Sequence, residues 1–225
     1  KAVMHVARSF DINRPGLRPS SLKGGVIGGS IVQGQFNIGD KIEIGPGRKI
    51  GEGKKVRYEP ISSVITSMQG GGLNLDTMQA GGLCGMATPL DPSFTTSDNL
   101  SGQVLAKEGH LPEIRDTISI QVNLMENMVT SDGDGPEPVM PLRNNEMLMV
   151  NVATSTSVGV VSKSQSGKAN LNLRLPICAD SGQRVSISRR VGSRWRLIET
   201  RRRTSPGPIT RQGCDTSARW LLQME

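Results

Sequence analysis

The chain has 225 residues and a formal net charge of +7 at pH 7, and only 3% of its residues are aromatic. This length accommodates one large domain or two of about 100 residues each, and we expect two. With so few aromatic rings, the cores must be built from Val, Ile, Leu and Met. The 27 Gly and 13 Pro residues follow no fixed period, which excludes collagen and favours many turns between short strands. We therefore predict an all-β protein with very little helix.

The positive charge leaves two interpretations open, a surface that meets phosphates and ordinary solubilising charge. Three cysteines far apart in the sequence and two histidines predict neither a disulfide framework nor a zinc site, which fits a cytoplasmic protein. No run of about 18 apolar residues is present, so we expect no membrane contact. The chain begins at Lys1 rather than Met, which leaves a fragment of a longer protein and a divergent protein as alternatives.

In chain order, the first half alternates short strands with glycine-rich breaks. Residues 2–8 and 26–34 predict strands, separated by a long loop with two prolines. A clean alternation predicts a strand over 41–44. Residues 45–55 carry four glycines and four basic side chains and predict a flexible cationic loop. Further strands are expected over 56–68, 80–87 and 103–106, and we place the end of the first domain within residues 107–111.

The second half repeats this pattern. Residues 118–124 alternate for seven positions, which is the clearest strand signal in the chain. Residues 132–138 are acidic and lack apolar side chains, so a mobile loop is expected there. Strands are predicted over 146–153, 158–162, 170–175 and 184–188, at the spacing of an antiparallel barrel or sandwich.

Motifs for catalysis are missing. No phosphate-binding Gly-x-x-x-x-Gly-Lys-Ser/Thr occurs, because Lys23 precedes the neighbouring glycines instead of following them. Neither histidine belongs to a hydrolytic motif. We therefore predict no catalytic residue, no metal site and no cofactor bound by this chain itself.

Two basic clusters are the main functional signal. The first includes Trp195 and predicts RNA contact, because arginine pairs with phosphate and stacks on bases; solvated arginines on edge strands are the alternative. Its members are Arg184, Arg189, Arg190, Arg194, Arg196, Arg201, Arg202 and Arg203. The second lies in the glycine-rich loop, where a partner contact and a solvated loop tip are equally supported. It consists of Arg48, Lys49, Lys54, Lys55 and Arg57.

Several strings occur in the order of a known family. Arg8-Ser9-Phe10-Asp11-Ile12-Asn13-Arg14-Pro15-Gly16 and the segment 22–34 resemble the start of domain II of the gamma subunit of eukaryotic and archaeal translation initiation factor 2. Residues 58–61, 80–83, 90–93, 98–105, 145–152, 184–190 and 195–198 follow the same family in order. The resemblance covers about residues 3–198. It implies two consecutive antiparallel β-barrels of the elongation factor Tu type, over 1–108 and 109–200, and a basic tail over 201–225.

The resemblance also implies a function. The family carries initiator methionyl-tRNA to the small ribosomal subunit, with GTP and Mg held by a GTPase domain that these residues do not include. By likeness to elongation factor Tu, the tRNA acceptor end is expected in a groove between that GTPase domain and the first barrel. Glycine allows a ribose or base to approach the backbone, while arginine and lysine meet phosphate. The groove residues that we predict are Arg8, Lys23, Gly24, Gly25, Val26, Gly28, Gly81 and Gly82.

Partners follow from the same resemblance. In the family the alpha subunit docks on domain II and the beta subunit on the GTPase domain, so residues 45–57 are predicted to contact the alpha subunit. The second barrel is predicted to lie near tRNA and small-subunit rRNA. The family's Gly-Trp-Gly segment for the last barrel strand is replaced here after Ile198, which puts closure of that barrel in question. The alternatives are an elongation factor Tu or selenocysteine-factor fragment and a standalone basic β-barrel that binds rRNA.

Overall fold

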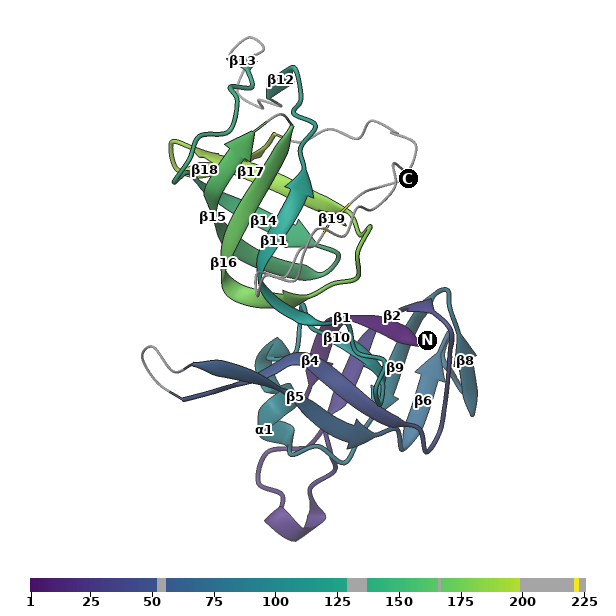
Figure 1. The fold of residues 1–225 in the computed structure, drawn as a ribbon. Coiled ribbons are helices and arrows are strands. Elements are labelled where there is room, and N and C mark those ends of the chain that lie inside the picture. The colour runs from purple at the N-terminus through teal and green to yellow at the C-terminus, as the bar shows by residue number, and fades with distance from the viewer. Residues whose placement is uncertain (52–55, 129–136, 166, 199–220, 223–225) are drawn as a thin grey trace. The chain divides into compact units, whose positions relative to one another are not determined.

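The computed structural model describes residues 1–51, 56–128, 137–165, 167–198 and 221–222. The chain divides into two compact units, Lys1–Ile114 and Arg115–Glu225 (Figure 1). Sequence reasoning placed the boundary between residues 108 and 109, within a short connector, whereas the contacts divide at the first residue of the next strand. Nearly all paired elements are antiparallel strands, which confirms the predicted fold class.

The first unit is an eight-stranded antiparallel sheet in the order β5-β4-β10-β1-β2-β9-β6-β7, with a separate two-stranded sheet of β3 and β8. The strands of the large sheet are β1 (Val3–Phe10), β2 (Val26–Gln33), β4 (Lys41–Ile50), β5 (Arg57–Val64), β6 (Ser67–Gly70), β7 (Leu73–Asn74), β9 (Leu83–Ala87) and β10 (Val104–Lys107), and the small sheet pairs β3 (Gln35–Asn37) with β8 (Thr77–Gln79). Helix is confined to η1 (Pro19–Ser21), α1 (Pro92–Thr95) and η3 (Thr96–Asp98) among the described residues of this unit.

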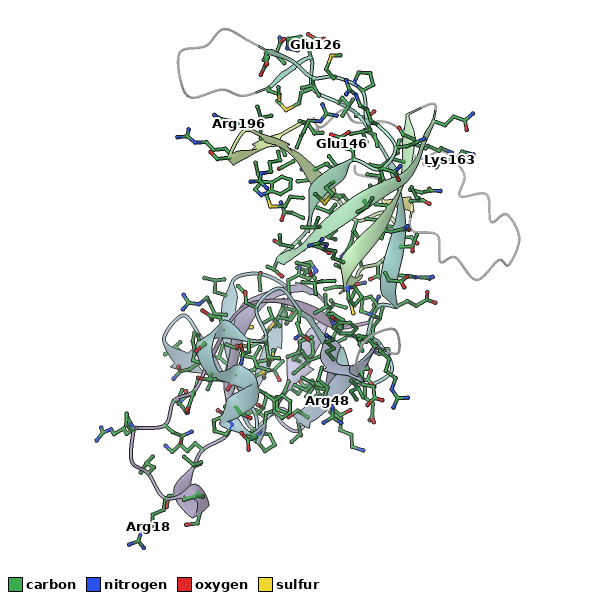
Figure 2. All side chains as sticks on the ribbon, turned by 90° about the vertical axis from the view of Figure 1, so that its left-hand side faces the viewer. Arg18, Arg48, Glu126, Glu146, Lys163 and Arg196 are labelled. Atoms are coloured by element: carbon green, nitrogen blue, oxygen red, sulfur yellow. The ribbon has the colours of Figure 1, made fainter. Side chains whose placement is uncertain are left out.

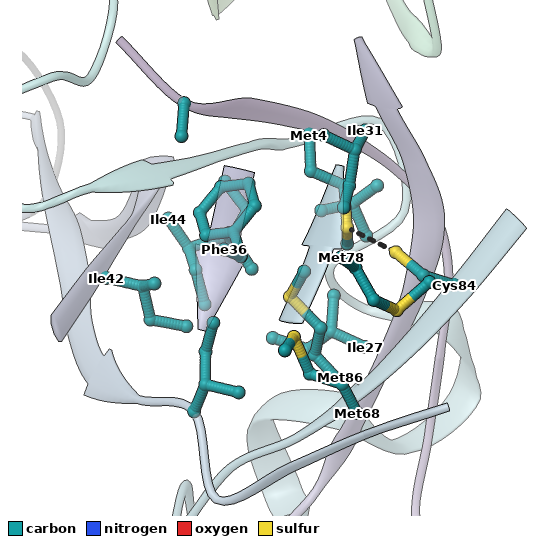
Figure 3. Close-up of a cluster of buried hydrophobic side chains, with 14 of the residues drawn as sticks. Met4, Ile27, Ile31, Phe36, Ile42, Ile44, Met68, Met78, Cys84 and Met86 are labelled. Carbon is teal, nitrogen blue, oxygen red and sulfur yellow. Dashed lines mark hydrogen bonds between the residues drawn. The ribbon is translucent and has the colours of Figure 1, made fainter. Parts of the chain in front are cut away.

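The core of the first unit is aliphatic and rich in sulfur. Met4, Met68, Met78, Met86 and Cys84 pack together with isoleucines and Phe36, and the Cys84 thiol lies 3.3 Å from the Met4 thioether (Figure 3). Methionine fills irregular gaps between strands, so it can replace the aromatic residues that the composition lacks. Burial raises the pKa of the Cys84 thiol to about 11, which keeps it protonated and unreactive at neutral pH.

A bulge in β1 decides which side chains reach the outer face of this unit. Met4 and Val6 point into the core, and strict alternation would send Arg8 after them. The register with β2 shifts between Val6, opposite Gly29, and Arg8, opposite Gly28. The extra residue turns Ser9 inward and leaves Arg8 and Phe10 outside. Ser101 Oγ donates to the carbonyl oxygen of Ala7 at 2.8 Å, which satisfies the bulged backbone.

A second bulge corrects the prediction of a loop over residues 45–55. Pairing of β4 with β5 shifts between Ile44 and Arg48 and then continues to Ile50, so residues 45–50 belong to a strand. Gly47 has a φ of +84°, and a Cβ there would lie 1.9 Å from the carbonyl oxygen of Glu59. The Gly47 amide also donates to Gln103 Oε1 at 2.9 Å. The glycine bends the strand without ending it, so the β4–β5 hairpin projects from the unit (Figure 1).

The second unit is a seven-stranded sheet in the order β18-β17-β14-β15-β16-β11-β19. Its strands are β11 (Ile114–Gln121), β14 (Met147–Val152), β15 (Ser155–Gln165), β16 (Lys168–Cys178), β17 (Val185–Val191), β18 (Arg194–Leu197) and β19 (Leu221–Leu222), and β12 (Asn127–Met128) pairs with β13 (Glu137–Pro138). β19 pairs parallel with β11, whereas every other pair recorded in this unit is antiparallel. The mobile loop predicted over 132–138 lies mostly outside the described residues, and its last two residues form β13.

Its core contains no aromatic ring among the described residues. Ile118, Leu148, Val161, Leu171 and Ile187 are fully buried at its centre. Each such side chain contributes about 1.5–3 kcal/mol when it leaves water. Strands were predicted over all four central segments, but the structure extends β15 and β16 to eleven residues each. No helix of the described residues is long and apolar enough to cross a membrane.

Alanine substitutions at two glycines near the start of β2 test how tightly the first unit is packed there. A Cβ at Gly24 would lie 1.9 Å from the carbonyl oxygen of Thr88, whereas a Cβ at Gly28 would meet only ordinary contacts, the nearest at 3.5 Å on Phe10. We expect Gly24→Ala to lower the free energy of unfolding by about 1–3 kcal/mol, because backbone must move. Gly28→Ala is the matched control. Equal stabilities in denaturant titrations of the two variants would contradict this.

Candidate nucleic-acid interface

The predicted groove residues of the first unit lie along strand β2. Arg8 of β1 is opposite Gly28, and Gly28 is opposite Gly85 of β9, so the three form one row across adjacent strands. On the outer face this row presents the Arg8 side chain followed by two positions without side chains. Ser30 and Ala87 on the same face are also small. The outer face of β1, β2 and β9 is therefore a place where a ligand can reach the backbone closely.

Arg8 is held by Asp98 from the η3 segment. The Arg8 Nε donates to both carboxylate oxygens of Asp98, at 2.8 and 3.0 Å, and the backbone amide of Ser9 donates to the same carboxylate at 2.9 Å. The Arg8 side chain remains 65% exposed. The hydrogen bonds from Arg8 and Ser9 lower the pKa of Asp98, and the carboxylate raises the pKa of Arg8. Both groups therefore remain charged at neutral pH.

Phe10 supports the same arginine. Its ring lies 5.8 Å from the Arg8 guanidinium carbon, within the range of a cation–π contact. The ring also lies over Gly28, since a Cβ built there would meet Phe10 Cζ at 3.5 Å. Phe10 is 39% exposed. Sequence reasoning did not assign a role to Phe10 or Asp98; Phe10 was hidden within a family string, and no local signal links Asp98 to a residue 90 positions away.

Lys23 and the next two glycines enter β2 through a fixed loop end. The Asn13 side chain donates to the Lys23 carbonyl oxygen at 2.8 Å and accepts from the Lys23 amide at 2.7 Å. The Lys23 side chain is exposed. A Cβ at Gly25 would lie 2.0 Å from Thr95 Oγ1, so Gly24 and Gly25 are required by packing within the unit. This is a structural reason for both glycines, and their ligand contact stays a prediction.

The remaining groove residues lie at different points of β2. Val26 begins the strand and pairs with Phe10 and Ala87. Gly81 and Gly82 form a turn with φ values of +117° and +69°, beside the far half of β2, where Ser30 Oγ donates to the Gly82 carbonyl oxygen at 3.1 Å. The eight predicted residues are thus brought onto one strand and its neighbours, in the order Lys23, Gly28, Gly82 along its length.

The basic residues predicted to contact the alpha subunit lie on the projecting hairpin. Arg57 and Arg48 lie 2.9 and 4.0 Å from the carboxylate of Glu59, so both are partly neutralised (Arg48 is labelled in Figure 2). Lys49, opposite Tyr58, is exposed on the hairpin. Lys54 and Lys55 lie outside the described residues. Figure 2 shows a second protrusion, the loop between β1 and β2, with Arg18 at its tip.

The arginine cluster of the second unit separates into two environments. Arg189 donates to both carboxylate oxygens of Glu146, one of them at 3.2 Å, and to the carbonyl oxygens of Met140 and Pro141 at 2.8 and 3.2 Å. The two charged side chains are only 15% and 17% exposed. Arg189 therefore ties the chain before β14 to β17, and this structural role was not anticipated from the sequence. Its predicted RNA contact stays a prediction.

The other members of the cluster lie at the surface. Arg184, Arg190 and Arg194 are exposed and Arg196 is half-buried on the edge strand β18 (Arg196 is labelled in Figure 2). Arg190 is opposite Trp195, which is 37% exposed. Arginine beside an accessible indole suits an RNA contact. The predicted members 201–203 lie outside the described residues.

Comparisons with known proteins agree with this architecture. Residues 116–200 match a family described as "Initiation factor eIF2 gamma, C terminal". Translation initiation factor 2 subunit gamma from Methanococcus aeolicus is 52% identical over 197 residues, which are 88% of this chain and 48% of the relative. The same subunit from Methanocaldococcus jannaschii is 49% identical over 195 residues, 87% of this chain and 47% of the relative. The chain thus spans about half the length of the curated relatives that it matches.

A solved structure shares the fold. The crystal structure of a bacterial selenocysteine-specific elongation factor has a TM-score of 0.58 and 19% identity, over 83% of this chain and 25% of that one. This likeness concerns the fold alone. The class of the protein, a translation initiation factor, is shown by the sequence relatives instead.

The sequence relatives are more specific. At about half of all positions identical over most of its length, the chain belongs to the family of the gamma subunit of translation initiation factor 2. The identity to the selenocysteine-specific factor is far lower, which favours the initiation factor over the elongation-factor alternative.

The two arginine environments predict different effects of substitution. Arg189→Ala leaves Glu146 charged and poorly solvated, so we expect the free energy of unfolding of the second unit to fall by about 2–4 kcal/mol. Arg190 is exposed, and among the described residues its recorded acceptor is the Gly192 carbonyl oxygen at 3.3 Å. Arg190→Ala should therefore change the free energy of unfolding by less than about 0.5 kcal/mol. Denaturant titration of both variants measures this. An Arg189→Ala variant as stable as Arg190→Ala would remove the structural role.

Proposed function

We propose that this chain is the part of an initiation factor 2 gamma subunit that, with a GTPase domain, binds initiator methionyl-tRNA and delivers it to the small ribosomal subunit. The observation that carries the proposal is the row Arg8, Gly28 and Gly85, where a fixed cation lies beside two backbone positions that carry no side chain of their own. Membership of the family supports it. GTP and Mg would be held by the GTPase domain, and the working location would be the cytoplasm.

In this proposal the first unit meets the acceptor end. An unpaired RNA 3′ end exposes phosphates and bases together, so it requires both a cation and close approach to a surface. Arg8 and Lys23 supply charge beside the first half of β2, and Gly28 and Gly85 add no side chain to the outer face there, whereas Leu83, opposite Ser30, is 76% exposed. The chain's residues contribute binding surface, and no catalytic role is proposed for them.

The other partners are proposed from the family and from charge. The alpha subunit would dock on the β4–β5 hairpin, and the beta subunit on the GTPase domain. Small-subunit rRNA or the tRNA body would meet the second unit through the exposed Arg184, Arg190 and Arg194 and the half-buried Arg196. A standalone rRNA-binding protein remains the competing function. It predicts RNA contact without preference for an unpaired end.

An RNA hairpin that carries a single-stranded ACCA 3′ end tests the acceptor-end contact. Titrated into the isotope-labelled chain, it should shift the amide resonances of Arg8, Gly28 and Gly85. A Cβ at Gly85 would have only Val26 Cγ1 at 4.0 Å as a neighbour, so Gly85→Ala should keep the fold. We expect this variant to bind the hairpin on the order of tenfold more weakly, because the methyl occupies the ligand's space.

The control ligand is the same hairpin with a blunt end. The acceptor-end function predicts that it leaves Gly28 and Gly85 unshifted. If both hairpins shift the same resonances, or if the shifts are confined to the second unit, the chain binds RNA in the manner of the competing function instead.

Substitution of the hairpin lysine tests the alpha-subunit contact. Lys49→Glu reverses an exposed charge without removing a recorded ion pair, whereas Arg57→Glu would also break the contact to Glu59. We expect Lys49→Glu to weaken capture of the alpha subunit on the order of tenfold, through like-charge repulsion at the interface. Lys168→Glu, on β16 of the second unit, is the matched charge reversal. Equal capture by the two variants would rule out the hairpin as the docking element.

A further inference from the structure

The contact between Arg8 and Asp98 leaves the outer end of the guanidinium available. Asp98 engages only the Nε nitrogen of Arg8, at 2.8 and 3.0 Å. No hydrogen bond of the Nη1 or Nη2 nitrogen is recorded with any described residue. The Phe10 ring limits movement on one side. The two terminal donors of Arg8 are thus aimed by Asp98 and free to bind a ligand.

The backbone that carries Asp98 is strained. Ser97 and Asp98 have φ values of +53° and +59°, and two successive non-glycine residues in this left-handed region are uncommon. An ion pair as exposed as Arg8 and Asp98 stabilises a fold very little. The exposed ion pair alone therefore does not account for this backbone conformation, and the hydrogen bond from the Ser9 amide, at 2.9 Å, also holds the Asp98 carboxylate. Strained backbone of this kind collects at sites where a side chain must be held in one place.

We propose that Asp98 is a positioning residue for RNA binding: it fixes Nε of Arg8 so that Nη1 and Nη2 meet a phosphate of the unpaired 3′ end. The inference rests on the proposed function of the first unit. Arginine binds phosphate best with two parallel N–H donors, and a side chain already aligned loses less conformational freedom on binding. Asp98 contributes by alignment, without touching the RNA itself.

Neutralising Asp98 should change RNA affinity in opposite directions, depending on whether Asp98 aligns Arg8 or acts through its charge alone. Asp98 is a negative charge close to a phosphate site, so its neutralisation should strengthen RNA binding if charge alone mattered. If Asp98 positions Arg8, its neutralisation should weaken binding. Asp98→Asn suits the test, because Asn adopts left-handed backbone readily and its oxygen can still accept from the Ser9 amide. That oxygen also keeps the 2.8 Å contact from Arg8 Nε, whereas the amide nitrogen replaces the second oxygen, so the 3.0 Å contact and the negative charge that hold Arg8 are lost.

The experiment measures affinity of the full 225-residue chain for the ACCA-ended hairpin, together with the thermal midpoint of each variant. We expect Asp98→Asn to bind about three- to tenfold more weakly, at an unchanged midpoint, through loss of a charge-assisted contact. Glu108→Gln is the control, because it neutralises another exposed carboxylate of the first unit, 3.9 Å from Lys41. It gives the size and sign of the general charge effect. Binding by Asp98→Asn that equals or exceeds that of Glu108→Gln overturns the inference.

A double-mutant cycle separates positioning from a structural role. In an Arg8→Ala background, Asp98→Asn should no longer weaken binding and should change affinity only by the general charge effect that Glu108→Gln measures, because no guanidinium remains to be aligned. An unchanged additional loss in that background overturns the inference. Arg8→Lys gives an independent check that leaves Asp98 in place, and it should bind more weakly than wild type, because an ammonium keeps the charge but lacks two parallel N–H donors. A lysine that binds as well as arginine would show that charge suffices and would also overturn it.

These outcomes distinguish the inference from the function on which it rests. Wild-type chain that fails to bind the ACCA-ended hairpin overturns both. Wild-type binding that is unaffected by Arg8→Ala or strengthened by Asp98→Asn removes the positioning role, while the acceptor-end function stands.

Discussion

The bulge in β1 is the constraint on which the outer face of the first unit depends. A strand that alternates strictly from Met4 through Val6 would bury Arg8 among methionines and isoleucines, where its charge would be unsupportable. One extra residue against β2 reverses the alternation, so that Ser9 turns inward and Arg8 turns out. The hydroxyl of Ser9 then accepts from the Leu100 amide at 3.1 Å, which binds the bulge to the segment that carries Asp98.

Register shifts also occur in two other strand pairs, β4 with β5 and β15 with β16. The bulge at Gly47 divides β4 into a part that closes over the core and a part that projects from it. A further shift, between Val161 and Lys163, lies in the longest hairpin of the second unit. Bulges increase local twist and redirect side chains without ending the hydrogen-bonded ladder. In this protein, such bulges decide which side chains lie on the outer face of the strands and which face the core.

The strands were predictable because apolar and polar residues alternate along their central parts. Most strands lie where this alternation predicted them. The strand pairing over residues 45–50 was not predicted, since the glycines and charges of this segment are typical of a loop and only the cross-strand partners reveal the pairing. Arg8 was found through a family string. Asp98 and Phe10 were missed for different reasons: Asp98 joins Arg8 across 90 residues, and Phe10 lay beyond the strand predicted over residues 2–8, whereas β1 continues to Phe10. Arg189 was interpreted as a surface cation because its partner Glu146 is 43 positions away.

The Asn13 side chain has a consequence for how this surface varies. Its amide pairs with both backbone groups of Lys23, in the manner of a neighbouring strand, and so fixes the two ends of the intervening segment. Closing a longer segment costs only slightly more entropy once its ends are held. Residues 14–22 can therefore change in length and sequence while Lys23 and the start of β2 remain in place. The protrusion can therefore differ between related proteins, and so fit different partners, without a change in the position of β2.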